Sequence, residues 1–75
     1  MTQLDVVYRY GLPAGEREMT GIDRMREVYG VRRVCFDEAD HTVRVEYDAT
    51  RLTDEIVAGL LRRAGIDLKE RIALA

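Results

Sequence analysis

Few side chains of this 75-residue chain could do chemistry by their type and spacing. The sequence has one cysteine, Cys35, and one histidine, His41, and its hydroxyl groups occur only on threonine and tyrosine. Covalent catalysis needs a nucleophile beside a base, and the sequence shows no such pair. The acids Asp37, Glu38 and Asp40 cluster at one predicted turn, which a solvated tip explains more simply than an acid–base pair or a calcium loop. We therefore expect no enzyme activity and no cofactor.

The segment YGLPAGER, Tyr10 to Arg17, lies between a strand-like and a helix-like segment, where small α+β domains often hold a phosphate, a metal or a partner. Its two glycines would let backbone amides converge ahead of a helix, whose positive end favours an anion. Against an anion site, Pro13 lacks an amide, and Glu16 and Glu18 place negative charge where the anion would sit. The segment also matches neither common glycine-rich phosphate motif. We therefore expect a turn that leads into a helix.

Two periodicities predict the elements that must position these residues. Alternating apolar residues predict strands over 4–10, 31–36 and 43–47, and a less regular one over 68–74. Helical spacing predicts one helix that begins between Ala14 and Thr20 and ends at Gly30, and another that Thr53 caps and Gly65 ends. The expected buried stripes are Met19, Ile22, Met25 and Tyr29 in the first helix and Ile56, Val57, Leu60, Leu61 and Ala64 in the second.

The element order βαββαβ is that of the ferredoxin-like α+β fold, a four-stranded antiparallel sheet with both helices on one face. A chain of this length forms one domain, residues 1–75, with one thin core. Because successive side chains of a strand point to opposite faces, Cys35 should lie on the open face of the sheet, whereas His41 falls at a position that points inward. The two side chains should therefore diverge. Met19 and Met25 are more simply core residues than metal ligands. We expect no metal site within one chain.

The pattern along most of the chain resembles the heavy-metal-associated (HMA) domain family. The residues that carry it are Gly30-Val31, Val34, Phe36, Val43, Val45, Tyr47-Asp48, Thr53, Glu55-Ile56 and Ala64-Gly65. This family includes copper metallochaperones, mercury-binding proteins and the N-terminal domains of metal-pumping P-type ATPases. Its chemistry lies in a G-M-x-C-x-x-C motif, whose two thiolates clamp a soft ion such as Cu(I).

The residues at the family's motif are Gly11 to Arg17, and only Gly11 carries over. Leu12 stands at the methionine, Ala14 at the first cysteine and Arg17 at the second. A methyl group donates nothing to a metal, and a guanidinium is a permanent cation. The resemblance therefore implies the family's scaffold without its metal site.

In this family the loop and the helix ends also serve as a docking surface between chaperone and pump. The resemblance thus implies a protein-interaction or regulatory module, with a metal-transport component as a candidate partner. The partner-binding residues we expect are Gly11, Leu12, Pro13, Ala14 and Arg17. The identity of the partner and the formation of a homodimer stay open at this point.

Cys35 offers an alternative function. It should lie beside Arg33 and near Arg44, and cations stabilise a thiolate. Cys35 is therefore a candidate reactive thiol, or a ligand in metal carriage through a site shared between two chains. A surface cysteine of ordinary reactivity is the simpler interpretation.

Composition disfavours other classes of partner. The net charge of −2 and the pI near 5.3 give no general attraction to nucleic acid or to anionic membranes. RNA-recognition domains share the predicted topology but stack bases on aromatic residues of the open sheet face. The outward positions here carry no aromatic residue; they are Asp5, Val7, Arg9, Arg33, Cys35, Arg44 and Glu46.

The expected location is the cytoplasm. A single cysteine fits a reducing compartment. The first residues, MTQLDVV, have no basic stretch typical of a signal peptide. The longest clearly apolar run, 56–61, is far shorter than the roughly 20 residues of a membrane span.

Overall fold

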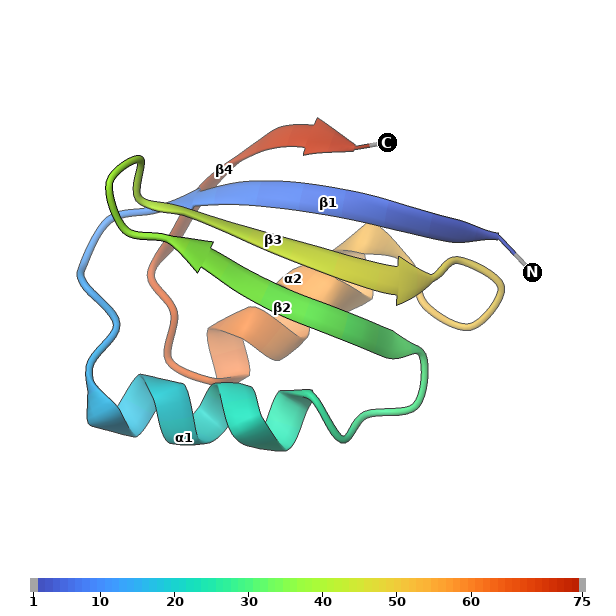
Figure 1. The fold of residues 1–75 in the computed structure, drawn as a ribbon, viewed down its shortest axis with the longest axis horizontal. Helices are drawn as coiled ribbons and strands as arrows, with labels where there is room; N and C mark the ends of the chain where they lie inside the picture. The colour runs from blue at the N-terminus through green and yellow to red at the C-terminus, as the bar shows by residue number, and fades with distance from the viewer. Residues whose placement is uncertain (1, 75) are drawn as a thin grey trace.

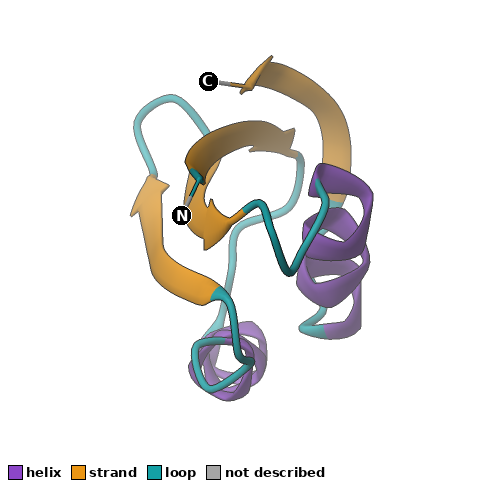
Figure 2. Ribbon diagram, turned by 90° about the vertical axis from the view of Figure 1, so that its right-hand side faces the viewer, coloured by secondary structure: helices purple, strands orange, loops and turns teal. Residues whose placement is uncertain are grey.

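The computed structural model describes residues 2–74 and confirms the ferredoxin-like α+β architecture (Figure 1). Its elements are β1 Gln3–Tyr10, α1 Glu16–Met25, β2 Val31–Asp37, β3 Thr42–Asp48, α2 Asp54–Arg63 and β4 Leu68–Leu74. The strands form one antiparallel sheet in the order β2-β3-β1-β4. Both helices lie on the same side of this sheet, which leaves its other face open (Figure 2).

The core lies between the central strands and the two helices. Its members alternate along the strands as predicted, because successive side chains of a strand point to opposite faces. Val6, Val43, Val45 and Tyr47 from the sheet, and Ile22, Val57 and Leu61 from the helices, are the largest fully buried side chains. The strand pairing Val34↔Val45 and Phe36↔Val43 fixes the register that puts Cys35 on the open face, opposite Arg44.

The second helix begins and ends as the sequence predicted. The Thr53 hydroxyl accepts a hydrogen bond from the Ile56 amide at 3.2 Å, which caps the first turn. At the other end Gly65 has a φ of 98°, and the Gly65 and Ile66 amides donate to the carbonyls of Arg62 and Leu61. This is the Schellman pattern, in which a glycine in the left-handed region satisfies the last carbonyls of a helix.

The prediction for the end of the first helix was wrong. Helix α1 ends at Met25, and residues 26–30 form turns in which Glu27 and Val28 donate to carbonyls only three residues back. This tightening moves Tyr29 off the buried stripe, and its side chain is 72% exposed with the Arg51 guanidinium 4.2 Å from the ring centre. Gly30 does adopt a positive φ of 103°, but it leads into β2 rather than ending the helix.

The buried faces of the two helices also differ from the prediction at their edges. Met19 is 36% exposed and Ile56 is 48% exposed, whereas Ala58, which was not predicted, is buried. Helix α2 is rolled so that the flank carrying Ala58 faces the sheet and the flank carrying Ile56 faces outward. The periodicity shows that a stripe exists but not how far the helix is rolled about its axis.

The fourth strand is confirmed as β4, at the edge of the sheet beside β1. Leu68 packs against the core, but Ile72 and Leu74 stay 53% and 42% exposed. Each helix is only ten residues long, and within residues 2–74 neither is long and apolar enough to cross a membrane.

Candidate functional site

The loop between β1 and α1 is held in place by two acidic residues outside it. The Gly11 amide donates to the Asp67 carbonyl at 2.9 Å, and the Leu12 amide donates to Asp67 Oδ2 at 3.2 Å. At the far end of the loop the Gly15 amide donates to Glu18 Oε1 at 2.8 Å. This is one half of a capping box, in which an acid three residues into the helix satisfies the amide of the capping residue. The loop backbone is therefore braced at both ends.

The hairpin turn between β2 and β3 supports the same loop from another side. His41, with a φ of 54°, accepts the Tyr10 amide on its carbonyl at 2.9 Å. Its ring stacks on the Tyr10 ring with centroids 5.4 Å apart, and Nδ1 lies 3.3 Å from the Gly11 carbonyl, to which it donates when that nitrogen is protonated. The interpretation of His41 as a turn residue agrees with this geometry, and the structure adds its contact with the loop.

The braced loop presents an apolar side chain to solvent. Leu12 is 70% exposed, and Pro13 is exposed next to it. Ala14 is half-buried and packs against the core, while Arg17 is exposed in the first turn of α1. The five residues predicted to bind a partner thus lie together, but only Leu12, Pro13 and Arg17 are freely accessible. We call Leu12 and Pro13 the apolar tip.

The geometry gives the anion interpretation no support. An anion at this loop would have to be bound by amides, but those of Gly11, Leu12 and Gly15 already donate to oxygens of Asp67 and Glu18. The Lys69 ammonium, 3.4 Å from Asp67 Oδ2, is likewise engaged by that carboxylate. Three of the amides that could attract a phosphate are thus already satisfied by oxygens of the protein itself.

Ala14 and Arg17, which the sequence resemblance placed at the positions of metal ligands, cannot ligate a metal. In the described part of the chain, no three histidine, cysteine or acidic side chains form a group that could hold a metal ion. Cys35 lies exposed on the open face, whereas the His41 ring stacks on Tyr10, which belongs to the buried core. The two side chains diverge as strand parity predicted.

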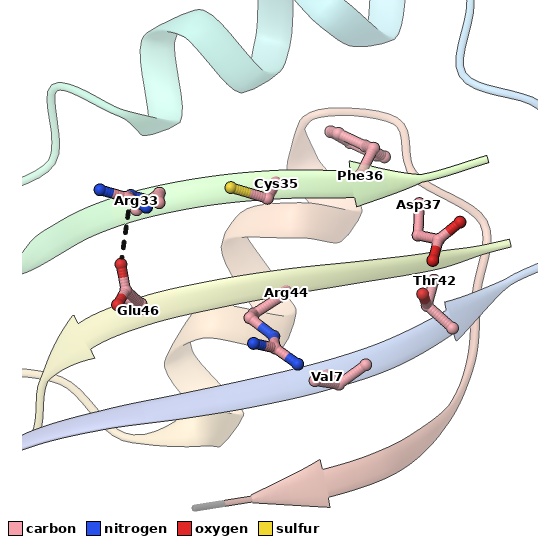
Figure 3. Close-up of a pocket in the computed structure, with 8 residues that line it drawn as sticks. All are labelled: Val7, Arg33, Cys35, Phe36, Asp37, Thr42, Arg44 and Glu46. Atoms are coloured by element: carbon pink, nitrogen blue, oxygen red, sulfur yellow. Dashed lines mark ion pairs between the residues drawn. The ribbon is translucent and has the colours of Figure 1, made fainter. Parts of the chain in front are cut away.

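Cys35 lies in a shallow hollow of the open face, of about 290 Å³, between Arg33 on its own strand and Arg44 across the strand pair (Figure 3). Arg33 is not a free cation, because its Nε lies 3.3 Å from a carboxylate oxygen of Glu46. Val7 contributes an apolar wall to the hollow. Cys35 thus has two arginines as neighbours, one of them already paired.

The aromatic rings of the strands do not form a base-stacking platform on the open face. Tyr8, Tyr10 and Tyr47 are buried beneath the sheet, as predicted, and Phe36 is half-buried with its ring edge-on to Tyr10. The RNA-recognition interpretation therefore gains nothing from the structure.

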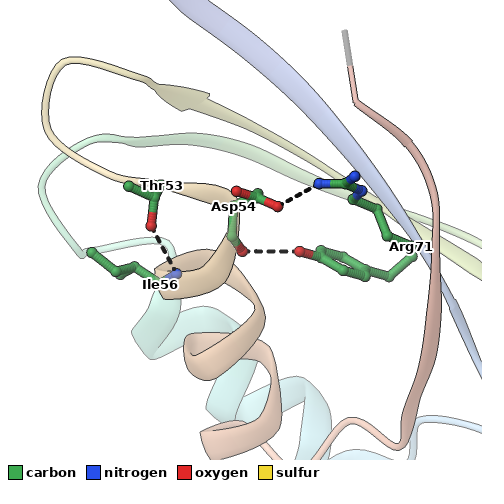
Figure 4. Close-up of polar contacts among 5 residues, drawn as sticks. Thr53, Asp54, Ile56 and Arg71 are labelled. Atoms are coloured by element: carbon green, nitrogen blue, oxygen red, sulfur yellow. Dashed lines mark hydrogen bonds and ion pairs between the residues drawn. The ribbon is translucent and has the colours of Figure 1, made fainter.

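A polar cluster that the sequence did not reveal joins the start of α2 to the sheet (Figure 4). Asp54 accepts from Arg71 of β4 at 2.6 Å, and its backbone carbonyl accepts from the Tyr8 hydroxyl at 2.9 Å. Burial, and then the Asp54 charge, raise the pKa of Tyr8 above its ordinary value of 10.0. These groups already satisfy one another, so the cluster fastens helix to sheet. No sequence signal links the three residues, because strand and helix packing alone brings them together.

Comparison with known proteins does not place the chain in a family. No protein-family model matches it, and a search of curated proteins found no significant match.

Proposed function

We propose that this protein is a binding module that uses the apolar tip and Arg17 to dock a partner protein. One observation carries the proposal: Leu12 is 70% exposed on a loop whose backbone is braced by Asp67 and Glu18. An exposed leucine on a mobile loop would lose much of its binding energy to ordering, whereas a preorganised loop avoids that cost. Arg17 lies beside the tip and supplies a donor for a carboxylate on the partner.

We further propose that the partner belongs to a metal-transport system in the cytoplasm. This rests on the ferredoxin-like fold and on the resemblance of the residue pattern to the HMA family, whose loop docks chaperone to pump. The replacement of both cysteines by Ala14 and Arg17 favours an adaptor or regulatory role over metal carriage. A partner unrelated to metal handling would remove the transport link and leave the binding module intact.

The proposal can be tested by measuring how much partner protein is captured by the wild type and by matched variants. A photo-crosslinking residue near Leu12 should attach to one partner protein in extracts of the source cells. Leu12→Ser should reduce capture of that protein at least several-fold, because an apolar side chain of this size contributes about 1.5–3 kcal/mol when fully buried. Ile72→Ser removes another exposed apolar residue, from β4, and should leave capture unchanged. Equal loss in both variants, or in neither, would contradict the proposal.

A second candidate rests on the exposed thiol. Cys35 is accessible on the open face, so the Cys35 thiols of two chains could ligate one soft metal ion between them. This predicts a dimer that forms with Cu(I), disappears with a chelator, and does not form in Cys35→Ser, as measured by analytical ultracentrifugation. A chain that stays monomeric with Cu(I) would eliminate this candidate.

A further inference from the structure

Helices α1 and α2 meet at Gly21 and Ala64, and an open groove runs along their junction on the side away from the sheet. Two adjoining hollows, of about 210 and 440 Å³, share Gly21, Arg24, Arg63 and Ala64 as lining residues. The first extends toward Met25, Val28 and Leu60, and the second toward Arg17, Thr20 and Gly65. We call the two together the interhelical groove.

Three arginines border this groove without a carboxylate partner in the described chain. Arg17, Arg24 and Arg63 are exposed and form no ion pair or side-chain hydrogen bond with any of residues 2–74. Several arginines elsewhere do have carboxylate partners, in the pairs Arg9–Glu70, Arg33–Glu46, Arg51–Asp48 and Arg71–Asp54. In a protein of net charge −2, this leaves a local excess of positive charge along one groove.

The acids of α1 do not neutralise the groove. At about 100° per residue, Glu16 and Asp23 lie about a quarter of a turn around α1 from Arg17 and Arg24, and neither acid forms an ion pair with these arginines in residues 2–74. Glu18 does reach one end of the groove, near Gly65, but its carboxylate accepts the Gly15 amide. Arg24 and Arg63 each lie in the last turn of a helix, where the dipole favours a cation, but this partial charge does not replace a carboxylate partner.

The floor of the groove is apolar. Val28 and Leu60 are half-buried, and Met25 and Ala64 are buried beneath them, so an apolar side chain of moderate size fits between the helices. An arginine fork recognises carboxylates with two parallel hydrogen bonds. We propose that the interhelical groove binds an acidic segment of a partner protein, which inserts an apolar side chain onto the floor while its carboxylates pair with Arg17, Arg24 and Arg63.

Charge complementarity and the apolar floor together select this occupant over nucleic acid. A phosphate backbone would use the arginines but not the floor, and the residues that line the groove include no aromatic ring on which a base could stack. The inference goes beyond the proposed function, because it concerns the junction of the two helices, which shares only Arg17 with the surface around the apolar tip.

The test is an NMR titration of the whole chain with a synthetic peptide of glutamates and leucines. The amide signals of Gly21, Arg24 and Gly65 should shift. The affinity should fall about 2- to 30-fold in the double variant Arg24→Gln/Arg63→Gln, as expected for two rim charge pairs. Arg44→Gln removes an arginine from the open sheet face and should leave the affinity unchanged. Arg17→Gln, which lies outside the last turn of either helix, provides an independent folded variant with a smaller loss.

Two further probes distinguish the interhelical groove from the apolar tip and from purely electrostatic binding. A peptide with serine in place of leucine should bind more weakly, and Leu12→Ser should bind the leucine peptide as the wild type does. The inference fails if the double variant keeps the wild-type affinity, or if Arg44→Gln loses as much affinity as the double variant does. It also fails if the serine peptide binds as tightly as the leucine peptide. It also fails if a single-stranded oligonucleotide shifts the same amides at lower concentration. Loss of binding in Leu12→Ser alone would place the peptide at the apolar tip and leave the proposed function standing.

Discussion

Gly21 of α1 packs directly against the backbone of Ala64 at the end of α2. A Cβ atom at Gly21 would lie 2.7 Å from both the Cα and the carbonyl oxygen of Ala64, closer than real Cβ atoms approach. Glycine is a poor helix former, but at position 21 it allows the two helices to meet. It also forms part of the floor of the interhelical groove.

The first prediction concerns this contact. Gly21→Ala should lower the free energy of unfolding by about 1–3 kcal/mol, because overpacking outweighs the gain in helix propensity. Gly59→Ala is the matched control, since a Cβ at Gly59 of α2 meets no atom within 4 Å. It should raise stability by about 0.5–1 kcal/mol. Urea unfolding measures both, and equal effects of the two substitutions would contradict the close contact.

The second prediction concerns the brace of the loop. Asp67→Ala removes the acceptor of the Leu12 amide and the partner of Lys69, and should cost about 1 kcal/mol or less at this half-exposed site. Hydrogen exchange at the Leu12 amide should become faster, and capture of the partner should weaken because the tip is no longer preorganised. Asp67→Asn keeps a side-chain oxygen as acceptor, so the Leu12 amide should exchange more slowly in this variant than in Asp67→Ala. Unchanged exchange in Asp67→Ala would show that the loop is held by other contacts.

The third prediction concerns the hydrogen bond between Tyr8 and the start of α2. Tyr8→Phe should cost about 0.5–1.5 kcal/mol, because the Asp54 carbonyl loses its donor while the ring stays packed. Tyr29→Phe makes the same chemical change at a ring that is 72% exposed and should change stability by less than about 0.5 kcal/mol. Thermal unfolding of the pair provides the comparison, and a Tyr8→Phe protein as stable as Tyr29→Phe would refute this role.

The fourth prediction concerns pH. Asp48 is buried and accepts from the Thr50 hydroxyl at 2.6 Å and from the Thr50 amide at 3.0 Å, and these bonds lower the pKa of Asp48 below its ordinary 3.8. Since the folded pKa lies below the unfolded one, this stabilisation is complete above about pH 4 and disappears as the pH falls through the folded pKa. Asp48→Asn should therefore be less stable at neutral pH and lose less stability on acidification. Denaturant titrations between pH 7 and pH 2 measure this.

Asp23→Asn is the control for the pH experiment, because Asp23 is an exposed acid of α1. It should follow the wild-type dependence closely. A wild type and an Asp48→Asn variant with parallel acid profiles would show that the Thr50 bonds contribute nothing to acid stability.

The sequence by itself determined the order and type of the elements. Alternation in β1 and β3, the Thr53 cap and the left-handed Gly65 are local signals, because each depends on residues within a few positions along the chain. Local signals were misleading where packing decided the outcome. Helix α1 ends five residues before Gly30, and the roll of α2 buries Ala58 in place of Ile56.

The features that matter most for binding were decided only by the tertiary structure. Asp67 is 55 residues from Leu12 in the sequence, and the three arginines of the interhelical groove come from two helices whose contact depends on Gly21. No periodicity encodes such pairs, because their proximity follows from how the helices pack against the sheet and against each other. The sequence thus identified the loop, while folding decided which of its residues are braced, which are exposed, and where positive charge collects.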